Sequence, residues 1–217
     1  MSTTTTFFTS SVGRKLMMGL TGFFLCSFLI VHLYINLFLF QNDGGKAFDA
    51  YAEFMATYPL IRPLEIVLFA GFLLHGFLGT FLWLANRRAR PVKYAVNDPG
   101  ENSTLASRIA FISGAGVLVF LVVHVNTFFV KSRFFPEGET MYDLVREAFK
   151  SPWYVGFYMV ALVFLGYHMK HGFQSAFQTF GLRNKKYEKL IDAAAVLFWL
   201  VIPAAFAAIP LFFLWAQ

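Results

Sequence analysis

Five long apolar segments restrict what this chain can fold into more than any other feature of its sequence. They cover residues 17–40, 62–86, 105–131, 152–181 and 191–215. Each one exceeds the ~20 residues that a helix needs to cross about 30 Å of hydrocarbon. Because lipid offers no hydrogen-bond partners to a bare backbone, each segment must be helical. We therefore predict an all-α membrane protein with five transmembrane helices, forming a single domain over residues 1–217.

The composition supports this class and excludes others. Charged residues make up 14% of the chain, against about 25% in a soluble domain. This excludes a disordered chain and a nucleic-acid-binding domain. The single cysteine, Cys26, excludes an internal disulfide, a multi-cysteine zinc site and an iron–sulfur cluster. In the fifth segment, Pro203 and Pro210 predict a kinked helix.

The basic residues indicate how the segments cross the membrane. Twelve belong to one side, in the N-terminal tail or around the second-to-third and fourth-to-fifth connections: Arg14, Lys15, Arg87, Arg88, Arg90, Lys93, Arg108, Lys170, Arg183, Lys185, Lys186 and Lys189. Six belong to the other side, alongside eight acidic residues: Lys46, Arg62, Lys131, Arg133, Arg146 and Lys150. By the positive-inside rule, we predict a multi-pass membrane protein with its N-terminus in the cytoplasm and its C-terminus outside.

Both outer connections contain an apolar stripe at helical spacing. The first stripe is Phe48, Tyr51, Ala52 and Met55, and the second is Met141, Leu144, Val145 and Ala148. We expect two short helices on the outer membrane surface. They either cap the helix bundle or roof a pocket that opens to lipid.

Histidines provide the strongest functional signal. None of the five lies in a connection: His32, His75 and His124 occupy the first three segments, and His168 and His171 the fourth. A polar side chain inside a membrane is costly, so a histidine in each of four helices favours a functional role.

The depths of these histidines sort them into two pairs. At a rise of 1.5 Å per residue, His32 and His124 lie about 24 Å and 25–28 Å beyond the cytoplasmic starts of their helices. His75 and His168 lie about 16 Å and 20 Å from the cytoplasmic ends of theirs. One pair therefore lies in the outer half of the membrane and the other in the cytoplasmic half. Each pair comes from two helices that run in the same direction.

Two imidazoles at one level suit haem iron with two axial histidine ligands. The chain has no CxxCH motif, so the haems would be non-covalent b-type groups. Zinc or copper would need three or four ligands at one depth, and only two are available. The first four helices would then form a bundle around two stacked haems. His171, one turn after His168, is an alternative ligand, or it contacts a propionate or a neighbouring helix.

Haem propionates are anionic and need donors near the membrane surface. The candidate donors are Arg87, Arg88, Lys93, Lys170 and Arg183 on the inner side, and Lys131 and Arg133 on the outer side. Glycines in the segments suit either a haem pocket or close helix packing, and we expect packing for most of them. These are Gly19, Gly22, Gly71, Gly76, Gly79, Gly114, Gly116, Gly166 and Gly172.

At these residues the chain resembles a known family over nearly its whole length: the five-helix, diheme cytochrome b membrane anchor of succinate:quinone oxidoreductases, that is, succinate dehydrogenases and quinol:fumarate reductases. The resemblance rests on FLIVHLYINLF around His32, RPLEIVLFAGFLLHGFLG around His75, VFLVVHVNTFF around His124 and GYHMKHGFQSAFQTFG around His168. The last is the most specific, because a histidine followed by glycine four residues later and then by Gly181 recurs in this group.

The resemblance implies roles and partners. His32 and His124 would hold the distal haem, and His75 and His168 the proximal haem. A flavoprotein with covalent FAD and an iron–sulfur subunit would be separate chains, since this one has no GxGxxG and only one cysteine. The basic cytoplasmic face would dock the iron–sulfur subunit. Electrons of the tricarboxylic acid cycle would then pass through both haems to a quinone, menaquinone, near the outer face, or run in reverse for fumarate reduction.

Quinone reduction also needs protons, so a titratable group should lie near the distal haem. The candidates are Asp49, Glu53 and Glu65, and some family members use a carboxylate near the start of the second helix. Glu65 lies inside an apolar run, where a carboxylate is costly, and pairs either with Arg62 or with a basic residue such as Arg108. Some menaquinol-oxidising members carry a glutamate two residues before the fourth-helix ligand, where this chain has Gly166.

Two other hypotheses compete with this one. The chain could be the diheme anchor of another respiratory complex, such as a nitrate reductase or a hydrogenase. It could also be a proton-coupled transporter with a histidine relay. Transporters usually contain inverted repeats and broken helices, and the absence of a visible repeat here argues against the second alternative.

Overall fold

The protein is helical throughout the part that the structure describes. The computed structural model describes residues 10–89, 101 and 103–215 and contains no strand within them. Its α-helices are α1 (Ser11–Asn36), α2 (Lys46–Thr57), α3 (Ile61–Arg88), α5 (Leu105–Arg108), α6 (Ala110–His124), α7 (Lys131–Phe134), α8 (Met141–Ala148), α9 (Pro152–Thr179), α10 (Glu188–Val196) and α11 (Ile202–Trp215). A 3-10 turn, η2 (Leu37–Phe40), and two π-helical turns, η3 (Val125–Val130) and η4 (Leu197–Val201), extend or join them.

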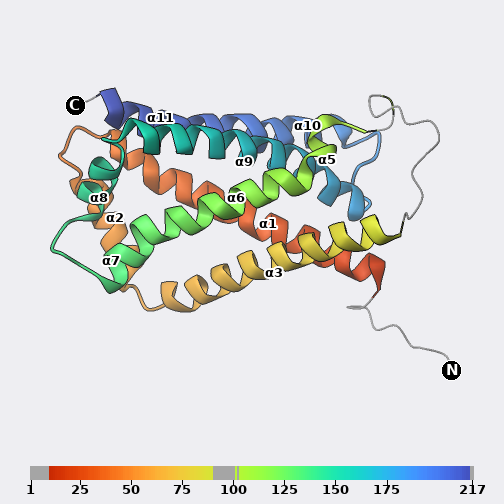
Figure 1. Ribbon diagram of the computed structural model, residues 1–217, viewed down its shortest axis with the longest axis horizontal. Coiled ribbons are helices and arrows are strands. Elements are labelled where there is room, and N and C mark those ends of the chain that lie inside the picture. Colours follow the sequence, from red (N-terminus) through yellow and green to blue (C-terminus); the bar gives the residue numbers. More distant parts are fainter. Residues whose placement is uncertain (1–9, 90–100, 102, 216–217) are drawn as a thin grey trace.

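The predicted all-α membrane class is confirmed. Four helical stretches are long and apolar enough to cross a membrane: Ser11–Phe40, Ile61–Arg88, Ala110–Phe134 and Glu188–Trp215. The remaining predicted span corresponds to α9, which passes this test only together with α8, bent from it by 95°. α9 is 28 residues long, or about 42 Å at the helical rise, and lies lengthwise beside the other spans (Figure 1). It carries His168, Lys170 and His171, which lower its apolar character.

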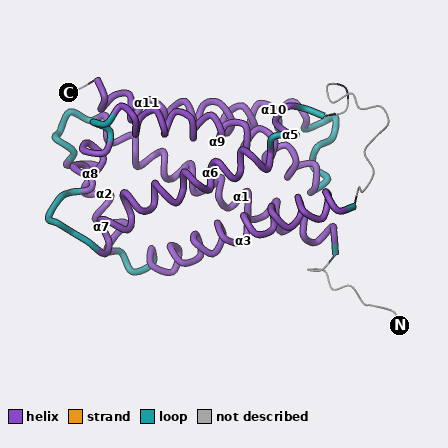
Figure 2. Tube along the Cα trace, viewed as in Figure 1, coloured by secondary structure: helices purple, strands orange, loops and turns teal. Residues whose placement is uncertain are grey.

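Four of the spans form a ring around a central axis. α1 packs on α3, α3 on α6, α6 on α9, and α9 on α1, which gives the four sides of a bundle. The two diagonals, α1 to α6 and α3 to α9, share no comparable contact. Neighbouring helices run in opposite directions (Figures 1 and 2), so the two helices of each diagonal run in the same direction, as the sequence predicted.

The fifth span lies outside this ring, against α9 and α1. Pro203 has no N–H to donate to the carbonyl of Trp199 one turn earlier, and the π-helical turn η4 occurs at this point. A Cβ atom at Gly166 of α9 would lie 2.9 Å from that carbonyl oxygen. Glycine therefore lets α9 approach the exposed backbone of the fifth span.

Helix exposure follows position in the bundle. α9 has eight buried residues, more than any other described helix, whereas α3 has none. Large apolar side chains such as Ile66 and Phe77 of α3 are more than 70% exposed. Side chains of this kind on the outside of a bundle suit contact with lipid rather than water.

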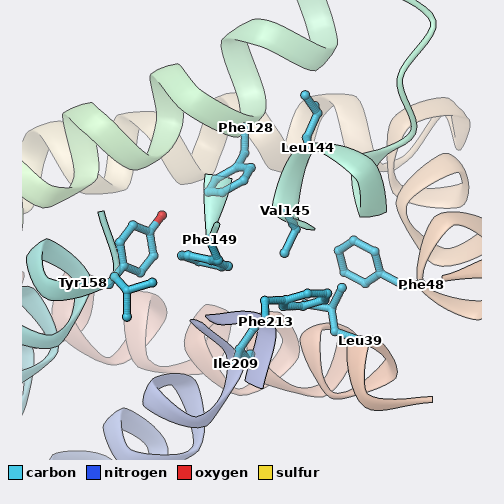
Figure 3. Close-up of a cluster of buried hydrophobic side chains, with 10 residues drawn as sticks. Leu39, Phe48, Phe128, Leu144, Val145, Phe149, Tyr158, Ile209 and Phe213 are labelled. Atoms are coloured by element: carbon cyan, nitrogen blue, oxygen red, sulfur yellow. The ribbon is translucent and has the colours of Figure 1, made fainter. Parts of the chain in front are cut away.

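The two connections predicted to be outer lie at one end of the bundle, and both contain the expected short helix. α2 and α8 pack against each other, and Phe48, Leu144 and Val145 from their apolar stripes are buried. Figure 3 shows these side chains meeting Phe128, Phe149, Phe213 and others from the ends of the spans. The two helices therefore cap the bundle through a shared core. This agrees with the capping interpretation.

The opposite end carries most of the positive charge. The start of α1, the end of α3, α5 and α10 lie together there (Figure 1). Ten of the twelve basic residues assigned to this side are described, and Arg90 and Lys93 lie outside the described residues. The end of α11 lies at the capped end (Figure 1).

We expect Gly166→Ala to lower the stability of the bundle, because the added methyl group meets the backbone oxygen of Trp199, which cannot rotate away. Overpacking of this kind costs about 1–3 kcal/mol. The measurement is the thermal unfolding midpoint of the purified protein in detergent. Gly156→Ala is the matched control on the same helix, since a Cβ there has nothing within 4 Å. Equal midpoints for the two variants would contradict this packing.

Candidate functional site

Four of the five histidines meet in two pairs at the centre of the bundle. The ring centres of His32 and His124 are 5.8 Å apart, with an angle of 89° between the ring planes. Those of His75 and His168 are 6.0 Å apart, with an angle of 77°. The first pair joins α1 to α6 and the second joins α3 to α9, so each pair bridges one diagonal of the bundle.

The two pairs lie at different levels along the bundle. The ring of His75 faces Gly22 of α1, where a Cβ would lie 3.4 Å from its Cε1 atom. The ring of His168 faces Gly114 of α6, with the corresponding distance 3.1 Å. His32 and His124 follow these glycines by ten residues each, or about 15 Å along the two helices. The separation is therefore somewhat larger than the order of 10 Å that depth arithmetic suggests.

The level of His75 and His168 is lined by small residues. Nδ1 of His75 lies 3.1 Å from Oγ1 of Thr21 on α1. Nδ1 of His168 is buried and has no hydrogen-bond partner among the described residues. Gly22 and Gly114 leave both rings room at this level.

The level of His32 and His124 is lined by aromatic rings. Phe28 stacks on His32 and Phe120 on His124, with ring centres 5.2 and 5.3 Å apart. Phe206 of the fifth span also lies 5.6 Å from His32. The sequence analysis did not assign this phenylalanine to the site.

Polar partners at this level are unequal. Nδ1 of His124 lies 2.8 Å from the hydroxyl of Tyr158, a buried residue of α9. Nδ1 of His32 lies 3.5 Å from the amide nitrogen of Asn36, which bonds more closely to the His32 carbonyl, at 2.8 Å. His124 therefore has a close side-chain partner at this level, and His32 does not.

The geometry of both pairs fits a metal held between two imidazoles. With a metal–nitrogen bond of about 2.0 Å, two rings that bind one ion from opposite sides have centres about 6 Å apart. Among the described residues, no group of three or more His, Cys, Asp or Glu side chains could hold a metal ion. Each level therefore offers two nitrogen donors across an open diagonal, a donor set that suits the two axial positions of haem iron.

His171 does not take part in either pair. The ring that faces His75 is that of His168, and His171 follows it by one turn as a partly buried side chain.

Several basic side chains proposed to bind propionates have other neighbours. Lys170 lies over the ring of Trp199 and Arg87 over that of Trp83. Arg183 contacts Asp192 at 3.3 Å, and Lys131 contacts Glu139 at 2.8 Å. Arg133 donates to the carbonyl of Ala56 at 3.4 Å, and Lys93 lies outside the described residues.

The three candidate carboxylates differ in environment. Glu65 pairs with Arg62 at 2.6 Å, one of the two partners expected. The other, Arg108, lies on α5 at the opposite end of the bundle (Figure 1), so that part of the expectation is wrong. Glu53 is exposed.

Asp49 has a structural role that the sequence did not reveal. Its Oδ1 atom accepts a hydrogen bond of 2.8 Å from the backbone N–H of Tyr142, in the first turn of α8. The fold brings Asp49 to an N–H that has no partner inside its own helix.

Gly166 occupies the position where some menaquinol-oxidising proteins carry a glutamate. A Cβ there would already lie 2.9 Å from the Trp199 carbonyl, so the helix packing leaves no room for a longer side chain. Of the other eight candidate glycines, four lie in close helix contacts as expected: Gly19, Gly71, Gly79 and Gly116. A Cβ at Gly71, for example, would lie 2.9 Å from the ring of Phe24, and one at Gly116 would lie 2.5 Å from that of Phe164. Gly22 and Gly114 face histidine rings instead, and a Cβ at Gly76 or Gly172 would have nothing within 4 Å.

Sequence reasoning missed Thr21 and Tyr158, although their positions carried a signal. Tyr158 precedes His168 by ten residues and Thr21 precedes His32 by eleven, which is close to the spacing of the two histidine levels. Depth arithmetic could therefore have placed Tyr158 with His124 and Thr21 with His75. It could not have shown which way these side chains point.

Comparison with known proteins identifies the family. Residues 84–207, more than half of the chain, match the model of the succinate dehydrogenase/fumarate reductase transmembrane subunit. The chain belongs to this family. It is also similar to the "succinate dehydrogenase cytochrome b558 subunit" of Bacillus subtilis (strain 168), with 26% identity over 159 residues, which covers 71% of this chain and 72% of the relative. No solved structure matches.

Membership of the succinate dehydrogenase/fumarate reductase family agrees with the resemblance found in the histidine segments. It favours that hypothesis over the anchor of a nitrate reductase or hydrogenase and over a transporter. The matched region includes His124 and His168, one histidine from each pair.

We expect Asp49→Ala to loosen α8 from α2, because it removes the carboxylate that accepts the Tyr142 N–H. Loss of such a partner at a helix start costs about 0.5–2 kcal/mol. Hydrogen exchange of the amides in residues 141–148 should be faster in the variant. Glu53→Ala, an exposed carboxylate on the same helix, is the control and should leave this exchange unchanged.

Proposed function

We propose that this protein is the diheme cytochrome b anchor of a succinate dehydrogenase/fumarate reductase complex. It would carry electrons between an iron–sulfur subunit and a membrane quinone, in either direction. The observation that supports this most strongly is the pair of facing imidazoles on each diagonal, found in a chain of this family. Bound haem b would supply a one-electron carrier at each level.

The four histidines would act as axial ligands. His75 and His168 would hold the haem nearer the basic end of the bundle, and His32 and His124 the haem nearer the capped end. In His75 and His124, Nε2 would supply the lone pair, because Nδ1 already has a hydroxyl neighbour. We propose the same nitrogen for His168 and His32. The bundle presents the rings across its two diagonals, where the helices share no contact comparable to those along the sides.

The basic end would face the cytoplasm and dock the iron–sulfur subunit, which in turn binds the FAD flavoprotein. This rests on the charge difference between the two ends and on the positive-inside rule. The protein would then lie in the bacterial cytoplasmic membrane with its N-terminus inside. Lys170, Arg183 and Arg87 lie toward this end, where haem propionates need cationic neighbours.

The quinone, for which we propose menaquinone, would react near the capped end, with Glu65 as its proton group. The antiparallel contacts between α1 and α3 support this choice. Thr21 faces His75, and a Cβ at Gly79 would meet Met18. Continued along both helices, this register places Glu65 at the level of His32. Its ion-pair partner Arg62 would hold the carboxylate in place.

Single substitutions of the histidines test the haem assignment. Reduced-minus-oxidised spectra of the purified complex should show two b-type haems per chain. His32→Ala or His124→Ala should remove one haem and leave the other, and His75→Ala or His168→Ala should do the reverse. His171→Ala serves as the matched control and should retain both haems. A wild-type complex without haem would end the proposal, and loss of a haem with His171→Ala but not His168→Ala would reassign the ligand.

The partner subunits can be tested by identifying the proteins and cofactors that co-purify. FAD together with iron–sulfur clusters supports the proposal. Molybdenum or nickel in the complex would instead indicate another type of respiratory anchor.

For the proton group, we expect Glu65→Gln to slow succinate:quinone reduction about 10²–10⁴-fold, the usual contribution of a general acid or base. Haem content should be unchanged, because Glu65 contacts none of the four imidazoles. Glu53→Gln provides the comparison. Equal rates in the two variants would exclude Glu65 from this role.

A further inference from the structure

The four imidazoles differ in the hydrogen-bond partner of their Nδ1 atom. His75 and His124 each have a side-chain hydroxyl within hydrogen-bond distance of Nδ1: Thr21 at 3.1 Å and Tyr158 at 2.8 Å. Nδ1 of His168 has no such partner, and Nδ1 of His32 has only the amide nitrogen of Asn36, at 3.5 Å. Each pair therefore contains one ring with a hydroxyl partner and one ring without.

The direction of the hydrogen bond at His75 follows from the chemistry of Thr21. Its Oγ1 lies 2.9 Å from the carbonyl oxygen of Met17 and 3.1 Å from that of Met18. A carbonyl can only accept, so the single hydroxyl proton goes to one of them. Oγ1 is then free to accept from Nδ1–H of His75. This places the proton on Nδ1 and leaves the lone pair on Nε2.

Tyr158 can act in the same way at the other level. Its hydroxyl lies 3.3 Å from that of Tyr154 as well as 2.8 Å from His124. When Tyr158 donates to Tyr154, it accepts from Nδ1–H of His124, and Nε2 is again free. Tyr158 is buried beside the core beneath α8, and Figure 3 shows it at the edge of that cluster next to Phe149. Its ring therefore cannot turn away freely.

The two hydroxyl contacts have equivalent places in the fold. The bond from His75 to Thr21 lies within the α1–α3 hairpin, and that from His124 to Tyr158 lies between the neighbouring helices α6 and α9. Each imidazole pair, by contrast, joins one of these hairpins to the other. One ring of each pair therefore has a hydrogen-bond partner on the neighbouring helix in addition to the imidazole that it faces across the diagonal.

We propose that Thr21 and Tyr158 are positioning residues that make the two axial ligands of each haem unequal. Each hydroxyl fixes the tautomer and orientation of one imidazole and, by accepting its Nδ1–H, makes that ring a stronger electron donor to iron. A stronger donor stabilises ferric over ferrous iron, so each hydroxyl lowers the midpoint potential of its own haem. This inference rests on the proposed haem ligation.

The test is a redox titration of both haems in the purified full complex. Thr21→Val should raise the midpoint potential of the His75/His168 haem alone, and Tyr158→Phe that of the His32/His124 haem alone. We expect the ferrous-to-ferric ratio at a fixed ambient potential to rise up to about tenfold, which corresponds to about 59 mV for a one-electron couple. The spectra of the single-haem histidine variants identify which haem has shifted.

Three further variants separate this effect from general damage. Thr21→Ser keeps the hydroxyl and should restore the wild-type potential. Thr179→Val removes a hydroxyl that bonds only to the Ser175 carbonyl of its own helix and should change neither haem. Tyr154→Phe should shift the His32/His124 haem less than Tyr158→Phe does, because Tyr154 reaches His124 only through Tyr158.

The outcomes distinguish this inference from the proposed function. If Thr21→Val and Tyr158→Phe both retain two haems with unchanged midpoint potentials, the inference is overturned and the diheme assignment stands. A shift of both midpoint potentials in either variant has the same consequence. Selective loss of one haem in Thr21→Val or Tyr158→Phe, at wild-type thermal stability, supports the inference, since such partners affect metal affinity about 10–100-fold. A wild-type complex that contains no haem would overturn both the inference and the proposed function.

Discussion

The arrangement of the bundle depends on how its centre is filled. The four central spans contact one another along the sides of a ring, whereas the two diagonals are bridged by imidazole side chains whose ring centres are 5.8 and 6.0 Å apart. Backbones on a diagonal therefore stay apart, and small residues such as Gly22 and Gly114 keep the space beside the rings from being filled. A flat group held from both faces needs this combination of separated backbones and opposed ligands.

The number of buried residues in each helix depends on where the helix lies in the bundle. α9 contacts three other spans and carries more buried residues than any other described helix, so it can include histidines and tyrosines on its inner side. α3 contributes a single imidazole to the centre and otherwise exposes apolar side chains. In lipid, helices gain little from burying leucine against leucine, so close contact at glycines and hydrogen bonds between helices carry more of the association. Gly166 against the Trp199 carbonyl and Tyr158 against His124 are contacts of this kind.

Much of this site could be predicted because a helix has a fixed rise. Depth arithmetic placed His32 with His124 and His75 with His168, and these are the pairs whose rings face each other in the structure. Which of His168 and His171 faces His75 was left open, since spacing alone does not give the rotation of a helix about its axis. The role of Asp49 was missed for a related reason: its partner N–H belongs to Tyr142, ninety-three residues later in the chain.

The sequence by itself determined that this chain is a helical membrane protein, where its long apolar segments lie, which end is basic and at what depth each histidine lies. These follow from local rules, because hydrocarbon forces an apolar segment into a helix and the helical rise then sets the depth. Only the tertiary structure decided which of His168 and His171 faces His75, that Thr21 and Tyr158 meet two of the four rings, and that Gly166 leaves no room for a side chain. Those outcomes depend on the rotation and packing of one helix against another, which no stretch of sequence specifies alone.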